Sequence, residues 1–196
     1  MPLLADVARA HAVDARLVTA RGARIVIAVA LLALLGALAA PTARSGKATT
    51  RVTLTSLESG VLSELNQIRV QHSLQPLKIS ARLTAAAAQH TREMGTAGYF
   101  EHNSNDGTAF WKRIGRLYGS TGYGYWSVGE NLLWSSPEVD APGALQLWMN
   151  SPEHRANILT PRWREIGISA QHFTAAPGTY KGLEVTIITT DFGVRH

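Results

Sequence analysis

The chain contains no cysteine, so any chemistry must come from His, Asp, Glu, Ser or Lys side chains. This composition excludes disulfide bonds, thiolate zinc sites, iron–sulfur clusters and a cysteine nucleophile. No H-E-x-x-H and no G-x-S-x-G sequence occurs, which argues against a thermolysin-like peptidase and against a serine nucleophile elbow. The glycine-rich segment 115–129 lacks the G-x-G-x-x-G order, and we interpret it as a long loop rather than a phosphate-binding one.

Four of the histidines have structural or surface interpretations. His90 shares a predicted helix face with Leu83 and Met94, which favours a hydrogen-bonded core residue over a ligand. His72, His172 and His196 are predicted to lie at the surface.

Aromatic residues gather around this loop, and they allow two interpretations. Aromatic rings can take up a lipid acyl chain or stack on sugars of a cell-wall polymer. The alternative is that the rings simply cover an edge of the sheet. The candidate ligand-binding rim consists of Tyr123, Tyr125, Trp126 and Trp134.

The charge pattern is too weak to predict nucleic-acid binding. The chain of 196 residues carries a net charge of +5. The one basic-aromatic cluster, Arg162-Trp163-Arg164, is more typical of a half-exposed tryptophan between solvated charges than of a base-stacking site. We therefore expect no nucleic-acid partner.

Helices are predicted for the first part of the folded region. A capping box at 55–58 and apolar residues at helical spacing predict a helix over 56–72. Ser80 is the expected N-cap of a second helix, which Gly95 and Gly98 should end. Shorter helices are predicted over 108–118, 144–150 and 152–158.

The last third changes to a strand pattern. Segments 166–170 and 183–192 are rich in β-branched residues and are separated by a Pro-Gly turn, which predicts an antiparallel hairpin. Helices followed by strands in one domain indicate an α+β layered fold.

The N-terminal segment has the layout of an export signal. An uncharged run, 25–40, follows Arg21 and Arg24 and ends with Ala37 and Ala39 in an A-x-A arrangement. The run is shorter than the roughly 20 residues that cross a bilayer untilted, so an uncleaved anchor is the second interpretation. We predict a signal peptide or membrane anchor over 1–40, a linker over 41–53 and a folded domain over 54–196, located outside the cytoplasm. Contact with a membrane is expected only through residues 25–40.

Six short segments then occur in a recognisable order: Asn66–Arg69, Leu83–His90, Tyr99–His102, Gly129–Asn131, Trp148–Leu159 and Glu165–Ile168. Together they resemble the bacterial branch of the CAP superfamily, also called SCP or PR-1-like domains. The resemblance covers about residues 54–193. It implies a three-layer α-β-α sandwich with a central antiparallel sheet.

The resemblance also implies a site. In the CAP superfamily, two histidines and one or two acidic residues line a cleft, and His102, Glu130 and His154 match these positions by motif. Eukaryotic members place a second glutamate where this chain has Ser151. Glu153 is the candidate fourth residue, although helix neighbours point about 100° apart, which would turn it toward solvent.

Several functions are compatible with such a site. Two neutral imidazoles and a carboxylate suit an open site for Zn²⁺ or another divalent metal, with Glu130 either as a ligand or as the orienting partner of an imidazole. The structural alternative is that both histidines only hydrogen-bond to Glu130 and the backbone. We expect an exported CAP-domain protein that binds a divalent metal or a polar ligand. The alternative function is a metal-independent lipid- or cell-wall-binding module, and a metal-assisted hydrolase ranks below both.

Overall fold

The computed structural model describes residues 52–196. The elements of this region follow one another as α1 (Ser56–Gln71), β1 (Lys78–Ile79), α2 (Ala81–Ala97), α3 (Phe110–Leu117), β2 (Trp126–Ser135), α4 (Ala141–Asn150), α5 (Pro152–Ile158), β3 (Glu165–Phe173), η1 (Gly178–Tyr180) and β4 (Val185–Arg195). The predicted leader and nearly all of the predicted linker lie outside the described residues. Among the helices of residues 52–196, none has the length and apolarity that spanning a membrane requires.

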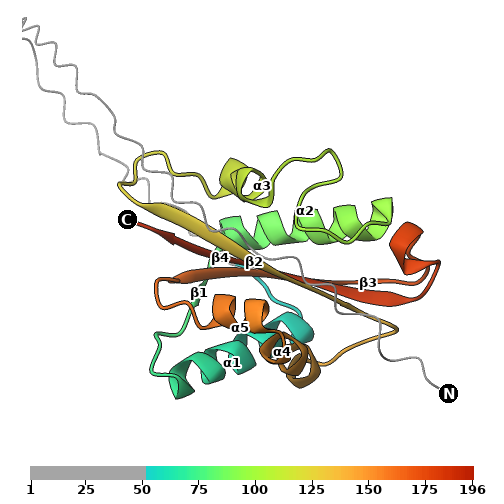
Figure 1. The fold of residues 1–196 in the computed structure, drawn as a ribbon, viewed down its shortest axis with the longest axis horizontal. Helices are drawn as coiled ribbons and strands as arrows, with labels where there is room; N and C mark the ends of the chain where they lie inside the picture. The colour runs from blue at the N-terminus through green and yellow to red at the C-terminus, as the bar shows by residue number, and fades with distance from the viewer. Residues whose placement is uncertain (1–51) are drawn as a thin grey trace, which may run out of the picture.

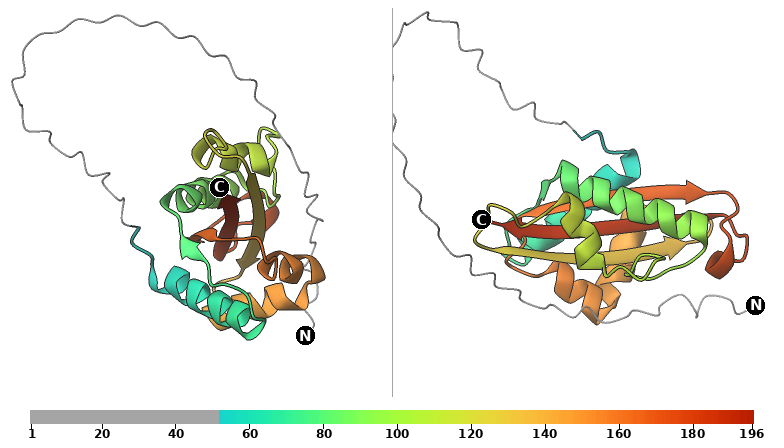
Figure 2. Two further views of the ribbon diagram at one scale, coloured as in Figure 1. Left: turned by 90° about the vertical axis from the view of Figure 1, so that its left-hand side faces the viewer. Right: turned by 90° about the horizontal axis from the view of Figure 1, so that it is seen from above.

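The strands form one sheet in the order β1-β3-β4-β2, with helices on both faces. Helices α2 and α3 cover one face, and α1, α4 and α5 cover the other (Figures 1 and 2). The three-layer α-β-α sandwich is therefore confirmed. The sheet is mixed rather than purely antiparallel, because β1 pairs with β3 in parallel over two residues, while β3–β4 and β2–β4 are antiparallel.

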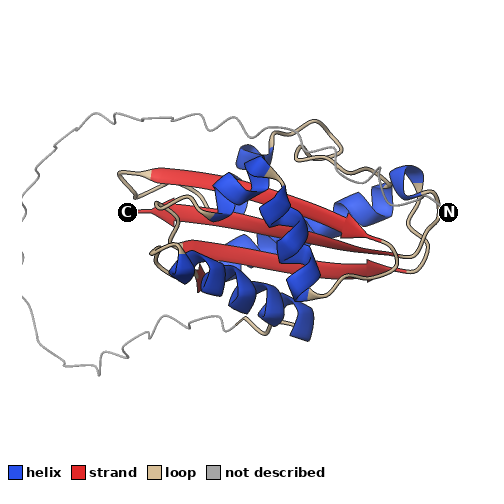
Figure 3. Ribbon diagram, turned by 60° about the horizontal axis from the view of Figure 1, so that its bottom comes forward, coloured by secondary structure: helices blue, strands red, loops and turns tan. Residues whose placement is uncertain are grey.

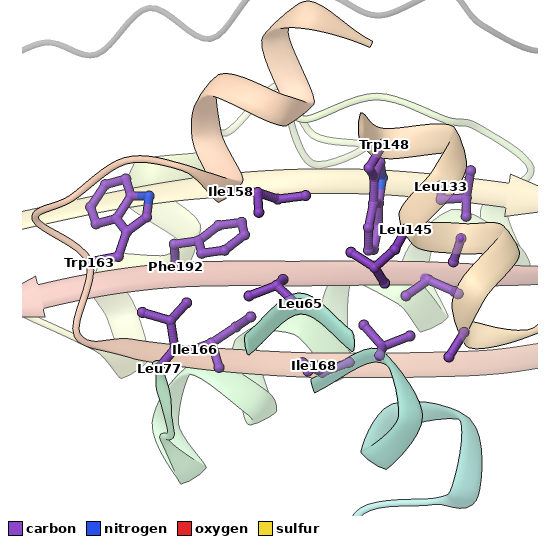
Figure 4. Packing of buried hydrophobic residues seen from close by; sticks show 14 of the residues in the cluster. Leu65, Leu77, Leu133, Leu145, Trp148, Ile158, Trp163, Ile166, Ile168 and Phe192 are labelled. Atoms are coloured by element: carbon purple, nitrogen blue, oxygen red, sulfur yellow. The ribbon is translucent and has the colours of Figure 1, made fainter. Parts of the chain in front are cut away.

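The main apolar core lies between the sheet and the layer of α1, α4 and α5 (Figure 3). Trp148, Trp163 and Phe192 are its largest side chains, and all three are buried. Trp163 stacks on Phe192 with ring centroids 6.1 Å apart (Figure 4). The long strands contribute inward-pointing apolar residues to this face at alternate positions, as the pleat of a sheet requires.

Helix α2 packs against the other face at very short range. A Cβ atom on Gly167 would lie 2.0 Å from the backbone carbon of Leu83, so only glycine allows this approach. Gly95, which the sequence suggested as a helix terminator, instead lies inside α2, where the ring of Phe173 occupies the space a side chain would need. The helix ends at Gly98, whose φ of 75° is the left-handed C-cap conformation.

The predicted caps of α1 and α2 have different outcomes. The capping box of α1 is present, because Thr55 Oγ1 accepts from Glu58 N and Glu58 Oε2 accepts from Thr55 N. Ser80 occupies the N-cap position of α2, but its side chain makes no capping hydrogen bond. Its backbone N–H instead donates a hydrogen bond to the carbonyl oxygen of Ile166 on β3.

The predicted long loop over 115–129 is shorter than expected. Helix α3 ends at Leu117, close to its predicted end at 118, but strand β2 already begins at Trp126. The run Gly129-Glu130-Asn131 in the middle of β2 interrupts the apolar alternation that would have identified a strand. That interruption is where the candidate site lies.

Candidate functional site

A band of polar residues crosses the sheet beneath α2. Glu130 on β2 and Asp191 on β4 stand directly opposite each other in the antiparallel ladder and are fully buried. Thr189 on β4 lies on the same face as Asp191, and its hydroxyl accepts a 2.8 Å hydrogen bond from Thr91 of α2. Strand alternation therefore places a carboxylate pair between the apolar clusters of this face.

Both oxygens of Glu130 have a partner. Oε1 lies 2.8 Å from His102 Nδ1, and Oε2 lies 2.5 Å from an Nη atom of Arg113. These contacts bring together the loop between α2 and α3, helix α3 and strand β2. In this arrangement Glu130 contacts His102 as the orienting partner of its imidazole, one of the two roles expected for it.

Arg113 holds this arrangement from inside the protein. It shares the buried face of α3 with Ile114, and the same Nη atom also donates to the carbonyl oxygen of His102 at 3.2 Å. One guanidinium therefore fixes both the carboxylate partner of His102 and the backbone of His102. A buried charge-assisted pair is strong only where its polar atoms have hydrogen-bond partners. The Nη atom of Arg113 that faces Glu130 has two such partners.

Glu130 is ionised, whereas Asp191 is neutral. Burial would raise the pKa of Glu130, but the positive charge of Arg113, the charge of His90 and the hydrogen bond with His102 outweigh it and lower the pKa below its usual value. Burial and the negative charge of Glu130 raise the pKa of Asp191 well above its usual value. Neither carboxyl oxygen of Asp191 has a hydrogen-bond partner among the described residues. Two adjacent buried carboxyl groups thus share one negative charge.

The contact with Glu130 determines the tautomer of His102. An ionised carboxylate can only accept a hydrogen bond, so Nδ1 of His102 must carry the proton. In the neutral ring, Nε2 is then the nitrogen with a free lone pair. A carboxylate that fixes an imidazole in this way is the usual outer partner of a metal-ligating histidine.

His154 belongs to the opposite layer of the sandwich. It lies on α5, which a hydrogen-bond network attaches to the edge strand β2: Asn131 Nδ2 donates to His154 O, and Asn157 Nδ2 donates to Glu130 O and to Asn131 Oδ1. Burial, together with the charge of nearby His102, lowers the pKa of His154 to about 4. Its imidazole is therefore neutral at neutral pH and able to bind a metal or accept a proton.

The remaining histidines of the described chain and Glu153 have other surroundings. Glu153 is exposed on α5, as helix geometry suggests. His90 lies on the buried face of α2 and is fully buried, with its Nε2 2.9 Å from Glu101 O, which confirms its interpretation as a core residue. The three histidines expected at the surface, His72, His172 and His196, are all exposed.

The four aromatic rim residues do not form one surface. Trp126 begins β2, whereas Trp134 lies near its other end and packs edge-on against Tyr180 with centroids 5.2 Å apart. Tyr125 stacks on His196, and Trp126 is half-buried and donates from Nε1 to Tyr118 O. Tyr123 is exposed. The structure therefore brings Tyr123, Tyr125 and Trp126 to one end of the molecule and separates Trp134 from them.

The donor chemistry of the site fits a metal only through its two imidazoles. No three His, Asp or Glu side chains within residues 52–196 converge as a ready-made metal site. His102 and His154 would supply two nitrogen ligands, and Glu130 would support His102 from behind. Imidazole nitrogens suit Zn²⁺ and the neighbouring transition metals, and such a site would complete its coordination with water or a ligand.

Two residues that matter here were not predicted from the sequence. Arg113 lies among other basic residues in α3, but its spacing from Phe110 and Ile114 places it on the buried helix face, which is a readable signal. Asp191 gives no such signal. Its neighbour across the ladder is Glu130 on β2, a strand that the sequence pattern does not predict.

Comparisons with known proteins agree with this fold. The model of the cysteine-rich secretory protein family, CAP, matches residues 62–181. The Bacillus subtilis protein YkwD is 30% identical over 116 residues, which cover 59% of this chain and 42% of YkwD. The membrane protein YlbC of the same organism is 30% identical over 136 residues, which cover 68% of this chain and 36% of YlbC. The matched region thus spans well under half the length of these curated relatives.

Solved structures show the same architecture. An extracellular SCP-domain protein from Bacillus anthracis has a TM-score of 0.50 at 26% identity, and the match covers 72% of this chain and 44% of that protein. An outer surface protein from Borrelia burgdorferi has a TM-score of 0.51 at 19% identity, with coverage of 69% and 90%, and it supports the fold alone. With a family match over more than half of its length, this cysteine-free chain belongs to the CAP family.

Proposed function

We propose that this CAP-domain protein acts outside the cytoplasm and binds a divalent metal ion or a polar ligand at the pair His102 and His154. The observation that carries the proposal is the buried, ionised Glu130, whose oxygen lies 2.8 Å from His102 Nδ1 and so leaves Nε2 as the free donor. The predicted leader supports an extracytoplasmic location, as does the B. anthracis relative, which is described as extracellular.

The two histidines are prepared for ligation by different means. His102 is held by Glu130 and, through its backbone, by Arg113. His154 is kept uncharged mainly because burial lowers its pKa to about 4. Metal ligation requires uncharged imidazoles, so the lowered pKa of His154 favours binding at neutral pH, while the contact with Glu130 orients the ring of His102. A Zn²⁺ ion bound there would supply Lewis acidity to a polar ligand that completes its coordination.

Calorimetric titration of the full chain with Zn²⁺ at about pH 7.5, above the usual imidazole pKa, tests this proposal. We expect saturable uptake by the wild type and none by the His102→Ala/His154→Ala double variant. The affinity should fall as the pH drops and be lost near pH 4, where His154 gains a proton. At about 100 times the dissociation constant, Zn²⁺ should add about 2.7 kcal/mol to the free energy of unfolding.

His72→Ala is the matched control, because it removes an exposed histidine at the end of α1 without touching the pair. It should bind Zn²⁺ like the wild type. Equal uptake by the wild type and the double variant would show that the pair is not the metal site, and the histidines would then have only their hydrogen-bonding role.

A further inference from the structure

The segment that carries His102 depends on other elements for its position. The chain between α2 and α3 turns back over α2 (Figure 1), and the His102 segment, residues 99–102, has no regular secondary structure. The hydrogen bonds of a helix or a strand therefore do not fix the backbone of His102. Side chains from the neighbouring helices supply this support instead, and Arg113 on α3 is one of them.

His90 on α2 supplies a second support. Its Nε2 lies 2.9 Å from the carbonyl oxygen of Glu101, which belongs to the peptide unit directly before His102. Arg113 Nη2 lies 3.2 Å from the carbonyl oxygen of His102, which belongs to the peptide unit directly after it. Two buried side chains, one from α2 and one from α3, thus hold the peptides on both sides of His102.

The contact with Glu101 also determines where His90 carries a proton. A carbonyl oxygen can only accept a hydrogen bond, so Nε2 of His90 must be protonated. In the neutral ring, Nδ1 then has the lone pair, and it lies 3.5 Å from the hydroxyl oxygen of Tyr99. His90 and His102 therefore require opposite tautomers, with the proton on Nε2 in His90 and on Nδ1 in His102.

Two further hydrogen bonds hold the same stretch of chain farther from His102. The Tyr180 hydroxyl donates to the carbonyl oxygen of Tyr99 at 2.9 Å, and Glu93 Oε1 accepts from Asn105 N at 3.2 Å. These bonds fix the stretch three residues before and three residues after His102. The contacts of His90 and Arg113 differ from them because they act on the peptides next to His102.

We infer that His90 is a positioning residue for His102, whose backbone it holds through the hydrogen bond to Glu101 O. An apolar side chain at position 90 would leave this carbonyl oxygen without the donor from α2, and the His102 segment would be held on one side only. The inference rests on the proposed function where it assigns a ligand to His102. The support of the backbone does not depend on that ligand.

A merely structural role of His90 predicts different behaviour. If His90 only filled space in the core, an apolar side chain of similar size would replace it, and only the stability would respond. A positioning role requires an N–H donor at the place of Nε2, which glutamine has and leucine lacks.

Two substitutions at this position separate the two roles in the full chain. His90→Leu removes the donor, and we expect it to weaken Zn²⁺ binding in calorimetry about tenfold, as loss of a supporting partner weakens a metal site. In the metal-free protein it should lower the ¹⁵N backbone order parameters of residues 100–103. His90→Gln keeps a donor and should retain most of the affinity and the order parameters of the wild type.

Leu83→Ala is the control for a loss of stability alone. Leu83 is buried on the same helix, in the apolar cluster with Ile114 and Tyr118, and its side chain has no polar atom. The variant should be less stable, but it should bind Zn²⁺ like the wild type and keep residues 100–103 ordered. Circular dichroism confirms that each variant is folded before the comparison.

The metal-free measurements separate this inference from the proposed function. If the wild type takes up no Zn²⁺, but His90→Leu loosens residues 100–103 and His90→Gln does not, the metal proposal fails and the positioning role stands. Long-range ¹H–¹⁵N spectra of the wild type need no variant: they should show the proton of the neutral His90 ring on Nε2.

Three results would overturn the inference. The first is a neutral His90 with its proton on Nδ1, because Nε2 could then donate nothing to Glu101 O. The second is His90→Leu with the order parameters of the wild type at residues 100–103. The third is an equal loss of order in His90→Gln and His90→Leu, or in Leu83→Ala and His90→Leu, which would assign the effect to packing.

Discussion

The two faces of the sheet bury side chains of different kinds between the same strands. Toward α1, α4 and α5 the buried cluster consists of apolar residues such as Leu65, Trp148 and Phe192. Toward α2 and α3 there are two smaller apolar clusters, one near Tyr118 and one near Tyr180. Between these two clusters lies the polar band with Glu130 and Asp191.

This difference separates stability from function. An apolar face gains free energy from every buried group, about 25 cal/mol per Å² of apolar surface. A buried charge stabilises nothing unless its partners are in place, and it costs several kcal/mol when they are lost. The α2/α3 face contains such a buried charge, Glu130, which positions His102. We therefore expect the two faces to respond to substitution in different ways.

The largest expected effect comes from removing the counter-charge of Glu130. Arg113→Met should lower the free energy of unfolding by about 3–5 kcal/mol at neutral pH, because it leaves a buried carboxylate without its cation. Urea denaturation measures the loss. Arg113→Met/Glu130→Gln is the matched control and should recover about 2 kcal/mol, since both charges are then absent. If the double variant is no more stable than Arg113→Met, the pair is not energetically coupled.

A truncation on the opposite face should cost nearly as much but behave differently. Leu145→Ala should lower the free energy of unfolding by about 3 kcal/mol through loss of apolar burial and the cavity left behind. The loss should be the same at pH 5 and pH 7, and Zn²⁺ uptake should remain unchanged. A loss that varies with pH would mean that the apolar face is not insulated from the polar band.

A smaller effect concerns the pH dependence of stability. His154 has its pKa lowered to about 4 in the folded protein, against about 6.5 in an unfolded chain. The unfolded state therefore binds more protons between these values, so stability is lost as the pH falls through this window. After allowance for solvent screening, the loss attributable to His154 between about pH 7 and pH 5 should be about 1 kcal/mol.

Urea denaturation of wild type and His154→Gln at pH 7 and pH 5 measures this contribution. It is the difference between the two proteins in how much the free energy of unfolding changes between these pH values. His90, whose pKa burial also lowers, remains in both proteins and cancels. Parallel pH profiles for the two proteins would contradict the burial of a neutral His154.

The smallest effect is expected at Asp191. Its pKa is raised in the folded protein, so its contribution to stability is fully present below the unfolded value of about 3.9 and is lost as the pH rises. Asp191→Asn keeps the shape of the neutral acid and removes this loss. It should raise the free energy of unfolding at neutral pH and leave it nearly unchanged near pH 4. A destabilisation of several kcal/mol at neutral pH would show that Asp191 is ionised and paired.

The helices of the fold could be predicted from the sequence because their signals are local. The expected helices begin at the capping box of Thr55 and at Pro152. The β-branched runs near the C-terminus likewise form the expected strands, β3 and β4. Strand β2 could not be predicted, because its centre is polar and its pairing with β4 joins residues far apart in the chain. Tertiary pairing overrides local pattern at such positions.

The site shows the same division between local and long-range information. His102, Glu130 and His154 could be identified by motif, but the choice between ligand and orienting partner for Glu130 depends on Arg113, a residue 17 positions away. The separation of Trp134 from Trp126 follows only once both are known to lie on one extended strand. Asp191 requires the register of the ladder, which no local pattern of this sequence encodes.

The central claim is that Glu130 fixes His102 with a proton on Nδ1 and a free Nε2 for ligand binding. Long-range ¹H–¹⁵N spectra of the imidazole rings at about pH 7.5, above the usual imidazole pKa, test it directly, with His102 assigned by comparison with His102→Gln. The account predicts a protonated Nδ1 and an unprotonated Nε2 on His102, with Zn²⁺ changing the Nε2 resonance of His102 and a ring-nitrogen resonance of His154. A proton on Nε2 of His102, or rings that do not respond to saturating Zn²⁺, would contradict it.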